Sequence, residues 1–328
     1  MSVGSTGARL ARPGGVGPFA FHFRRLAPIS RQIRSGSTLP VLGPTTRAVL
    51  GSALRTPTAQ VGLVVLGTFV VMAVLAPWLV VHDPSHIEPL RRLQPPSSRH
   101  WLGTDDLGRD VAARLIHGAR TSMVVAGGVA VASIVLGTLL GLVAGYHRRY
   151  DEILMRGVDG LMAFPGILLG ITLVVRLGPQ LRSVLLALTL VYTPLVARLV
   201  RAATLMVRDQ PFVEAARASG ASAPRILRLH VLPNVASPLL AQWSFIAGLA
   251  VLSEASLSFL GASVGPEASS WGAMLRDGQR LLSSAWWMAV PPGIALTSTV
   301  LACTLIGDAL RDSLDPRSRR RGGPRRPH

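Results

Sequence analysis

The sequence predicts an all-α polytopic membrane protein, because it is rich in apolar residues, poor in charge and contains long charge-free stretches. Of its 328 residues, 49% are hydrophobic and 15% are charged, whereas soluble domains carry about 25% charged residues. All 34 basic residues are Arg, and 16 acidic residues leave a formal net charge of +18. Several charge-free stretches are long enough to cross a bilayer core about 30 Å thick. An ordinary soluble globule does not fit this composition.

Residues 1–55 are predicted to be a basic, disordered cytoplasmic tail. They hold eight Arg, no acidic residue and much Gly, Ser and Pro, so they bury too little apolar surface to fold. The same composition is typical of an organellar transit peptide, which is the alternative interpretation. At the other end, residues 311–328 are predicted to be a second basic cytoplasmic tail that contacts anionic headgroups.

Six apolar stretches are predicted to be transmembrane helices, the first over residues 56–81 and five more in a core over residues 121–310. The clear charge-free windows are residues 59–81, 121–146, 235–253 and 281–307. Two shorter windows, 160–175 and 183–197, flank a turn at residues 176–182 and are predicted to form an antiparallel pair. Bordering Arg side chains that snorkel would extend both to about 20 residues, whereas a re-entrant hairpin would not cross.

The distribution of Arg predicts that both termini lie in the cytoplasm. With six crossings the two termini share one face, and that face carries 24 Arg against 10 on the opposite face. Cytoplasmic loops of membrane proteins carry an excess of basic residues. The high net charge is therefore a topology signal, and it gives no reason to expect a nucleic-acid partner.

Residues 82–120 are predicted to be an extracytoplasmic loop with an interfacial helix. The acidic stretch 104–110 could suggest a calcium loop, but it lacks the spaced oxygen ligands and the terminal Glu of such loops. We favour a capped turn that leads into the amphipathic stretch 111–116, and we expect no metal site.

Two sets of residues within the apolar windows are predicted to shape the helix bundle. Gly137, Gly141 and Gly145 recur at four-residue spacing, which places a smooth stripe where another helix can approach closely. The second set consists of helix-breaking prolines, which free backbone carbonyls: Pro165, Pro194 and Pro292. Hinges of a moving bundle and static kinks both explain these prolines.

Residues 209–234, between the fourth and fifth windows, are predicted to form a short helix, a tight corner and a second helix. Asp209 is expected to cap the first helix, with Pro211 in its first turn, and Gly220 is expected to end it in a left-handed conformation. Ser222 is expected to cap the second helix, with Pro224 in its first turn.

The second helix of this segment has an expected contact face and an expected end. Ile226, Leu229 and His230 would share one face at three- and four-residue spacing, and Pro233 would close the helix. The result is a rigid knob on the membrane surface that can engage another protein. An interfacial amphipathic helix explains the pattern about as well.

The same segment carries a recognisable motif. Glu214-Ala215-Ala216, followed after three residues by Gly220 and after nine more by His230, resembles the EAA signature of ABC importer permease subunits. More narrowly, the chain resembles the C-type member of the dipeptide/oligopeptide/nickel branch, which pairs with a B-type permease. The further matching blocks, within residues 56–317, are 101–110, 113–120, 150–159, 163–166, 253–261, 270–275 and 307–317.

This resemblance implies a fold, a mechanism and a set of partners. It implies the type I permease (MetI-like) core of an ABC importer in a bacterial cytoplasmic (inner) membrane. The implied partners are a second, B-type permease subunit, two ABC ATPase subunits and an extracytoplasmic solute-binding protein. The implied cargo is a dipeptide or oligopeptide, with nickel or another small solute as the alternative. The chain itself is expected to be no enzyme and to bind no cofactor, with ATP and Mg used by the ATPase subunits.

The resemblance also implies which residues contact the ATPase. A coupling segment over residues 209–234 would dock into a cleft of that subunit and transmit its closure. The coupling residues implied are Glu214, Ala215, Ala216, Arg217, Gly220, Ile226, His230, Pro233 and Asn234. The chain contains no Lys, so it cannot carry the Lys of a Walker A phosphate loop.

Two rival classes fit the sequence less well. Residues 261–265 read Gly-x-Ser-x-Gly, which with six spans resembles an intramembrane serine protease of the rhomboid type, in which a later span supplies the His. The one His after Ser263 is His328 in the basic tail. A secondary carrier or channel would share the six spans, yet such carriers usually place ionisable groups near the middle of the membrane. No His and no Asp lies within an apolar window, and Glu254 lies at the border of the fifth.

Overall fold

The computed structural model describes residues 51–314, apart from 52, 54, 80–82, 263 and 266–268. The two predicted tails lie almost wholly outside the described residues, and Ser263 lies outside them as well. Among the described residues the ordered elements are helices, and an isolated bridge between Thr104 and Asp110 is the one trace of strand pairing. The all-α class predicted from the sequence is confirmed.

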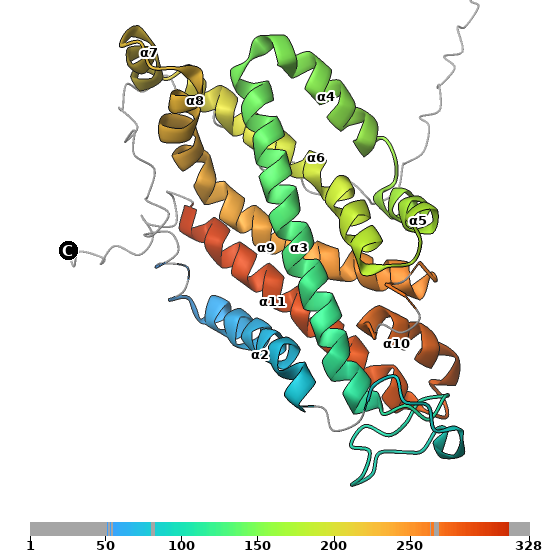
Figure 1. The fold of residues 1–328 in the computed structure, drawn as a ribbon. Helices are drawn as coiled ribbons and strands as arrows, with labels where there is room; N and C mark the ends of the chain where they lie inside the picture. Colours follow the sequence, from blue (N-terminus) through green and yellow to red (C-terminus); the bar gives the residue numbers. More distant parts are fainter. Residues whose placement is uncertain are drawn as a thin grey trace, which may run out of the picture. The chain divides into compact units, whose positions relative to one another are not determined.

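Five helices of the described part are long and apolar enough to cross a membrane (Figure 1). They are α2 (Pro57–Leu79), α3 (Val111–Tyr146), α6 (Leu181–Arg208), α9 (Leu232–Phe259) and α11 (Val290–Leu314). α3 packs along α6 and also contacts α2 and α9, while α11 packs against α9 and α2. Five of the six predicted windows therefore fall on such helices, although α11 begins nine residues into its window and continues four residues into the predicted tail.

The predicted third span has a different form. It consists of α4 (Arg148–Met162) and α5 (Gly166–Leu177), which are bent by 88° at a short break. Pro165 occupies the N-cap position of α5, where its fixed φ and its missing N–H suit the start of a new helix. α5 has 12 residues and is too short to cross a bilayer alone, so the pair is a broken span or a re-entrant segment.

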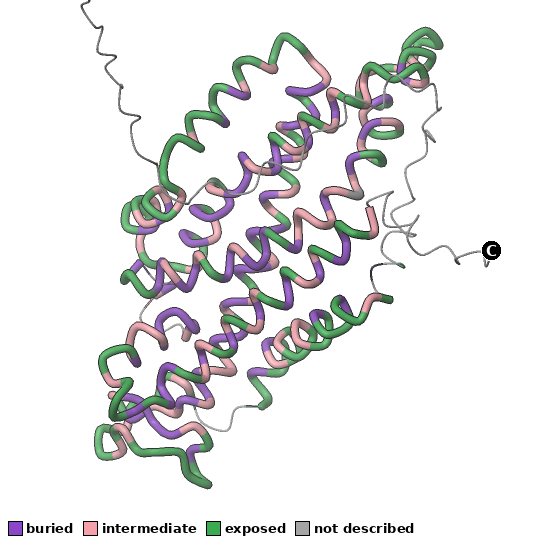
Figure 2. The backbone as a smooth tube through the Cα atoms, turned by 180° about the vertical axis from the view of Figure 1, so that it is seen from behind, coloured by how far each residue is buried: buried purple, intermediate pink, exposed green. Residues whose placement is uncertain are grey.

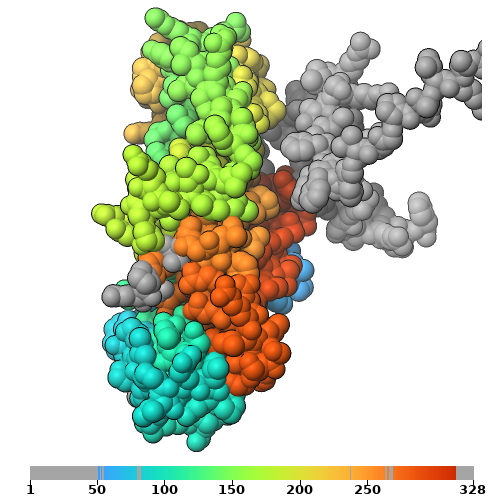
Figure 3. Space-filling view, turned by 90° about the vertical axis from the view of Figure 1, so that its right-hand side faces the viewer, coloured from blue at the N-terminus to red at the C-terminus, as the bar shows by residue number. Residues whose placement is uncertain are grey.

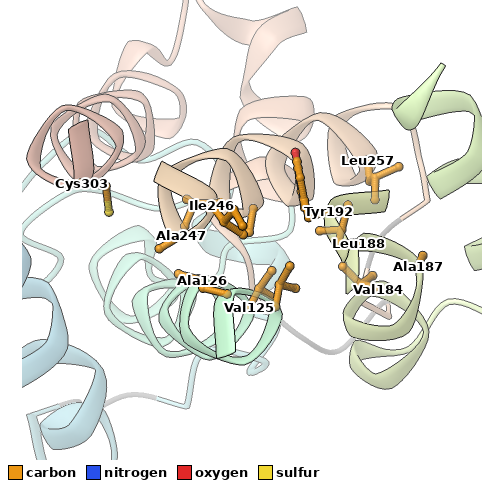
Figure 4. Close-up of a cluster of buried hydrophobic side chains, with 14 of the residues drawn as sticks. Val125, Ala126, Val184, Ala187, Leu188, Tyr192, Ile246, Ala247, Leu257 and Cys303 are labelled. Atoms are coloured by element: carbon orange, nitrogen blue, oxygen red, sulfur yellow. The ribbon is translucent and has the colours of Figure 1, made fainter. Parts of the chain in front are cut away.

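The core lies between α3, α6 and α9. Val125 from α3, Val184 and Leu188 from α6, and Ile246 from α9 are among its buried side chains (Figure 4). The hydroxyl of Tyr192 lies 2.6 Å from the Ser253 hydroxyl, which adds a polar link between α6 and α9. Figure 2 shows that buried residues line the surfaces where the long helices face one another, as expected for helices that expose apolar side chains to lipid.

The glycine stripe of α3 faces α6. A Cβ added at Gly137 would lie 2.4 Å from the Val196 Cβ, and one added at Gly141 would lie 2.6 Å from the Ala197 carbonyl oxygen. At Gly145 the nearest atom would be the Thr204 Cβ, again at 2.6 Å. Close approach of the two backbones therefore depends on the absence of side chains along this stripe.

The three prolines singled out from the sequence occupy three different environments. Pro165 lies at the break before α5, and Pro194 lies inside the continuous helix α6. Pro292 lies in the first turn of α11, where a proline removes no helical hydrogen bond. Pro292 therefore does not break α11 as the sequence predicted, because the helix begins at Val290, nine residues after the start of the window at residue 281.

The predicted interfacial helix at residues 111–116 is the beginning of α3. Asp110 caps the helix, and its side chain accepts a hydrogen bond from the Ala112 N–H. The side chain of Asp105 accepts hydrogen bonds from the backbone N–H groups of Leu107 and Arg109, which closes the turn before the cap. The helix then runs without a break into the membrane-spanning part, because nothing between residues 111 and 121 stops it.

Candidate functional site

The residues predicted to couple to an ATPase lie in one segment, residues 209–234, which we call the corner segment. It comprises α7 (Pro211–Ala218), α8 (Ala223–Ile226) and the π-helical stretch η4 (Leu227–Val231), which continues into α9. The segment joins the end of α6 to the start of α9, at the end of the bundle opposite α10 (Figure 1). A displacement of the corner segment therefore acts directly on two long helices.

α7 begins one residue later than the sequence predicts. Gln210 is the N-cap residue with an extended backbone, and Pro211 follows in the first turn. Asp209 instead ends α6, and its carboxylate lies 3.3 Å from the Arg208 Nε. The predicted capping role of Asp209 is wrong, because a capping residue needs the extended conformation that Gln210 adopts.

Gly220 ends α7 in the left-handed conformation that the sequence predicts, with φ +80°. The Ala221 N–H donates to the Ala216 carbonyl, and the Gly220 N–H donates to the Arg217 carbonyl. This pair of bonds is the Schellman motif, which satisfies carbonyls at a helix end and fixes the direction of the following chain. A Cβ at Gly220 would meet no atom within 4 Å, so glycine is needed there for its backbone conformation.

The second helix does not stop at Pro233. Ser222 stands at the N-cap of α8 without a side-chain hydrogen bond, and Pro224 lies in the first turn. The chain then widens into the π-helical stretch and enters α9, with Pro233 in the first turn of that helix. A π turn is one way in which a helix changes its hydrogen-bonding register, and here it ends at Val231, two residues before Pro233, whose nitrogen cannot donate.

The π-helical stretch also separates the side chains predicted to share one face. Ile226 is fully buried, whereas Leu229 is 50% exposed. The His230 ring lies 6.1 Å from the Phe212 ring, so it contacts α7 across the corner. Asn234 donates from its side-chain nitrogen to the His230 carbonyl, at 2.6 Å. The prediction that Ile226, Leu229 and His230 share one face is wrong, because a π turn changes the angle between successive residues.

The corner segment has a buried side and an exposed side. Val213 is fully buried, as is Ile226, and Phe212 and Ala216 pack against the core. On the other side, the exposed residues of the predicted coupling set are Glu214, Ala215, Arg217, Gly220, Pro233 and Asn234. The exposed side of the corner segment is thus held in place by a small set of buried apolar side chains.

A polar cleft lies beside the corner segment, and the sequence pattern gave no reason to expect it. Its volume is about 370 Å³, and it is lined by Tyr146, Arg148, Arg208, Asp209 and Arg217. These residues come from α3, α4, α6 and α7 and from the turn between the last two. Sequence reasoning counted these arginines as topology signals, because their proximity depends on how the helix ends meet.

Similarity to known proteins identifies the class of this helical bundle. Residues 119–320 match the family described as binding-protein-dependent transport system inner membrane component. The chain belongs to this family and is a multi-pass permease subunit of an ABC importer. Residues 50–96 match the N-terminal transmembrane domain of oligopeptide transport permease C, which confirms the resemblance to the C-type branch.

Individual relatives narrow the comparison further. The chain is 46% identical over 269 residues to a Brucella abortus protein assigned to a peptide transport system as a permease, covering 82% of this chain and 91% of the relative. It is 40% identical over 260 residues to the dipeptide transport system permease protein DppC of Alkalihalophilus pseudofirmus, covering 79% and 86%. The di/tripeptide permease DppC of Pseudomonas aeruginosa is also 40% identical, over 263 residues, covering 78% and 87%.

Proposed function

We propose that this chain is the C-type permease subunit of an ABC importer for dipeptides or oligopeptides. The relatives named above are assigned to peptide, dipeptide and di/tripeptide transport, which supports this cargo over nickel. The proposed partners are a B-type permease, two ATPase subunits that use ATP and Mg, and an extracytoplasmic solute-binding protein. The distribution of Arg supports an inner-membrane orientation with both termini in the cytoplasm.

The observation that carries the coupling role is the construction of the corner segment. α7 and α8 meet at a fixed angle at Gly220, and Val213 and Ile226 anchor them in the apolar core. The segment is continuous with α6 on one side and with α9 on the other. Closure of an ATPase that binds the exposed side of the corner segment would therefore shift α6 and α9 as rigid bodies.

The exposed charges of the corner segment suggest how the ATPase is recognised. Glu214 and Arg217 project from α7, and Arg225 and Arg228 project from the second helix, with Glu214 the one acidic group among them. The three arginines suit acidic groups on a partner, and anchoring at the membrane face remains their alternative role. Glu214 suits a basic group, and its reversal tests docking without disturbing the buried base.

The coupling role is tested by Glu214→Lys and Gly220→Pro in the complete transporter. We expect both variants to lose co-purification of the ATPase subunits and ATP-driven uptake. Glu152→Lys on α4 is the matched control, because Glu152 is also exposed and lies outside the corner segment. Normal assembly and normal uptake in both corner variants would overturn the proposed coupling role.

The energy source and the cargo have their own tests. Uptake into membrane vesicles loaded with ATP should persist after the proton and sodium gradients are dissipated. Complete loss of uptake with the gradients would favour a secondary carrier. The cognate solute-binding protein should be captured and its bound small molecule identified by mass spectrometry, and a bound metal without peptide would refute the proposed cargo.

A further inference from the structure

We propose that the cleft formed by Tyr146, Arg148, Arg208, Asp209 and Arg217 binds the phosphate of an anionic phospholipid from the inner leaflet. The lipid would then hold the corner segment to the ends of α3 and α6. This inference rests on the cytoplasmic orientation proposed above. It assigns a ligand site to residues that, apart from Arg217, lie outside the predicted coupling set.

The charge of the cleft favours an anion. Three guanidinium groups line it against one carboxylate, that of Asp209. Arg208 has a side chain only 12% exposed, its Nη1 donates to the Gly145 carbonyl at 2.8 Å, and its Nε faces Asp209 at 3.3 Å. This fixes one guanidinium in place at the wall of the cleft. Arginine presents several N–H donors in a planar fork that matches the oxygens of a phosphate.

The other two arginines are less restrained. The Arg217 guanidinium lies 5.0 Å from the centroid of the Tyr146 ring, and its Nε donates to the Tyr146 hydroxyl at 3.3 Å. Arg148 is exposed, and its side chain makes no hydrogen bond or ion pair with any residue that the structure describes. An anion in the cleft would give Arg148 the counter-charge that the described residues do not supply.

The position of the cleft favours a lipid over an ion from the cytosol. Tyr146 is the last residue of α3 and Arg208 is the last residue of α6, so the cleft lies where two apolar spans end. Tyr and Arg are typical of the headgroup level of a bilayer. Val143 and Met206, within one helical turn of these residues, are exposed apolar side chains that can contact acyl chains. Basic pockets between helix ends on the cytoplasmic side are typical sites for anionic headgroups.

A bound lipid would have a mechanical consequence. Arg217 belongs to α7, whereas Tyr146, Arg148 and Arg208 belong to the ends of α3, α4 and α6. A single phosphate contacted by these groups would cross-link the corner segment to three other helices. The membrane composition would then influence how firmly movement of the ATPase is transmitted.

The experiment uses the complete transporter in phosphatidylcholine nanodiscs that contain a photoactivatable phosphatidylglycerol. We expect labelled peptides from the cleft, and we expect Arg148→Gln to lower this labelling about five-fold, the effect of losing roughly 1 kcal/mol of charge attraction. Arg149→Gln is the matched control, since Arg149 is a neighbouring exposed arginine that does not line the cleft. Arg217→Gln should lower the labelling as Arg148→Gln does.

Three outcomes would overturn the proposal. An equal loss in the Arg149 control would mean diffuse attraction of anionic lipid without a site. Suppression of labelling by inorganic phosphate in the native protein would mean that a soluble anion occupies the cleft. Unchanged labelling together with loss of the ATPase subunits in Arg148→Gln would mean that the cleft receives an acidic side chain of the partner. Labelling is measured without transport, so its result is independent of the uptake tests of the coupling role.

Discussion

Loop 83–110 and α10 (Trp271–Gly278) form one region, which we call the loop region. It lies at the end of the long helices opposite the corner segment (Figures 1 and 3). The two regions differ in whether their charged side chains are buried or exposed. In the loop region, Arg114 donates to Asp105 at 2.6 Å and to Asp277 of α10 at 3.1 Å. Asp105 is 1% exposed and Arg114 is 5% exposed, so this network is buried. In the corner segment the charged side chains are exposed, and buried apolar residues hold the backbone.

The charged groups of the loop region are paired with one another within the chain, and this difference supports the proposal that the corner segment meets a partner. The indole N–H groups of Trp271 and Trp287 donate to the carbonyls of Leu115 and Thr104, each at 3.0 Å, so both indole groups also have partners within the chain. A buried ionic network is costly to disrupt, because loss of one member leaves the others uncompensated. Exposed charges contribute little to stability and are free to select a partner.

The strongest test of this comparison is Asp105→Asn. The substitution keeps a side-chain oxygen for the turn but removes the charge that faces Arg109 and Arg114. We expect the free energy of unfolding to fall by about 3 kcal/mol or more, because the buried Arg114 guanidinium loses the nearer of its two carboxylate partners. The measurement is thermal unfolding of the detergent-solubilised transporter. A loss within the range of exposed charge pairs would show that the network is not the source of rigidity.

The packing between the two ends is tested by Gly141→Ala. An added methyl group would lie 2.6 Å from the Ala197 carbonyl oxygen and from the Val200 Cβ, so α3 and α6 must separate. We expect a loss of about 1–3 kcal/mol, measured by the same unfolding assay. Gly127→Ala is the control, because a Cβ there meets nothing within 4 Å and should be neutral or stabilising. Equal stability of the two variants would contradict the close contact.

A smaller and more local effect is expected from Gly220→Ala. The new side chain has space, but an alanine at φ +80° costs about 1–2 kcal/mol. We expect the angle between α7 and α8 to become less fixed. ATP-driven uptake should then be affected more strongly than the stability measured by the unfolding temperature. Gly220→Asn should retain more uptake, because asparagine adopts the left-handed conformation more readily. An alanine variant as active as the native protein would show that the angle at this corner does not matter.

The smallest effect is expected from Arg198→Gln. Arg198 of α6 pairs with Asp159 of α4 at 2.5 Å, but both side chains are at least half exposed. We expect a change in unfolding free energy of less than about 1 kcal/mol, which decreases further at high salt. A loss as large as that of Asp105→Asn would remove the distinction between exposed and buried charges.

The sequence predicted much of the fold, because apolar windows and turn residues are local signals. The class of fold, the positions of the long helices and the left-handed glycine at the end of α7 could all be found in this way. The broken third span was harder to predict, because the 88° bend at residues 163–165 depends on how α4 and α5 meet their neighbours. The passage of the chain through Pro233 into α9 was missed for a similar reason, since a proline near a helix start is ambiguous without its context.

By itself, the sequence determined that this chain is helical, spans a membrane repeatedly and carries an EAA-type segment between two of its spans, since hydropathy and motif spacing are properties of neighbouring residues. The tertiary structure decided which charges meet. Arg114 and Asp277 are 163 positions apart, and the arginines of the polar cleft come from separate helix ends. Such contacts depend on the packing of whole helices, and no local pattern records the register in which those helices lie against one another.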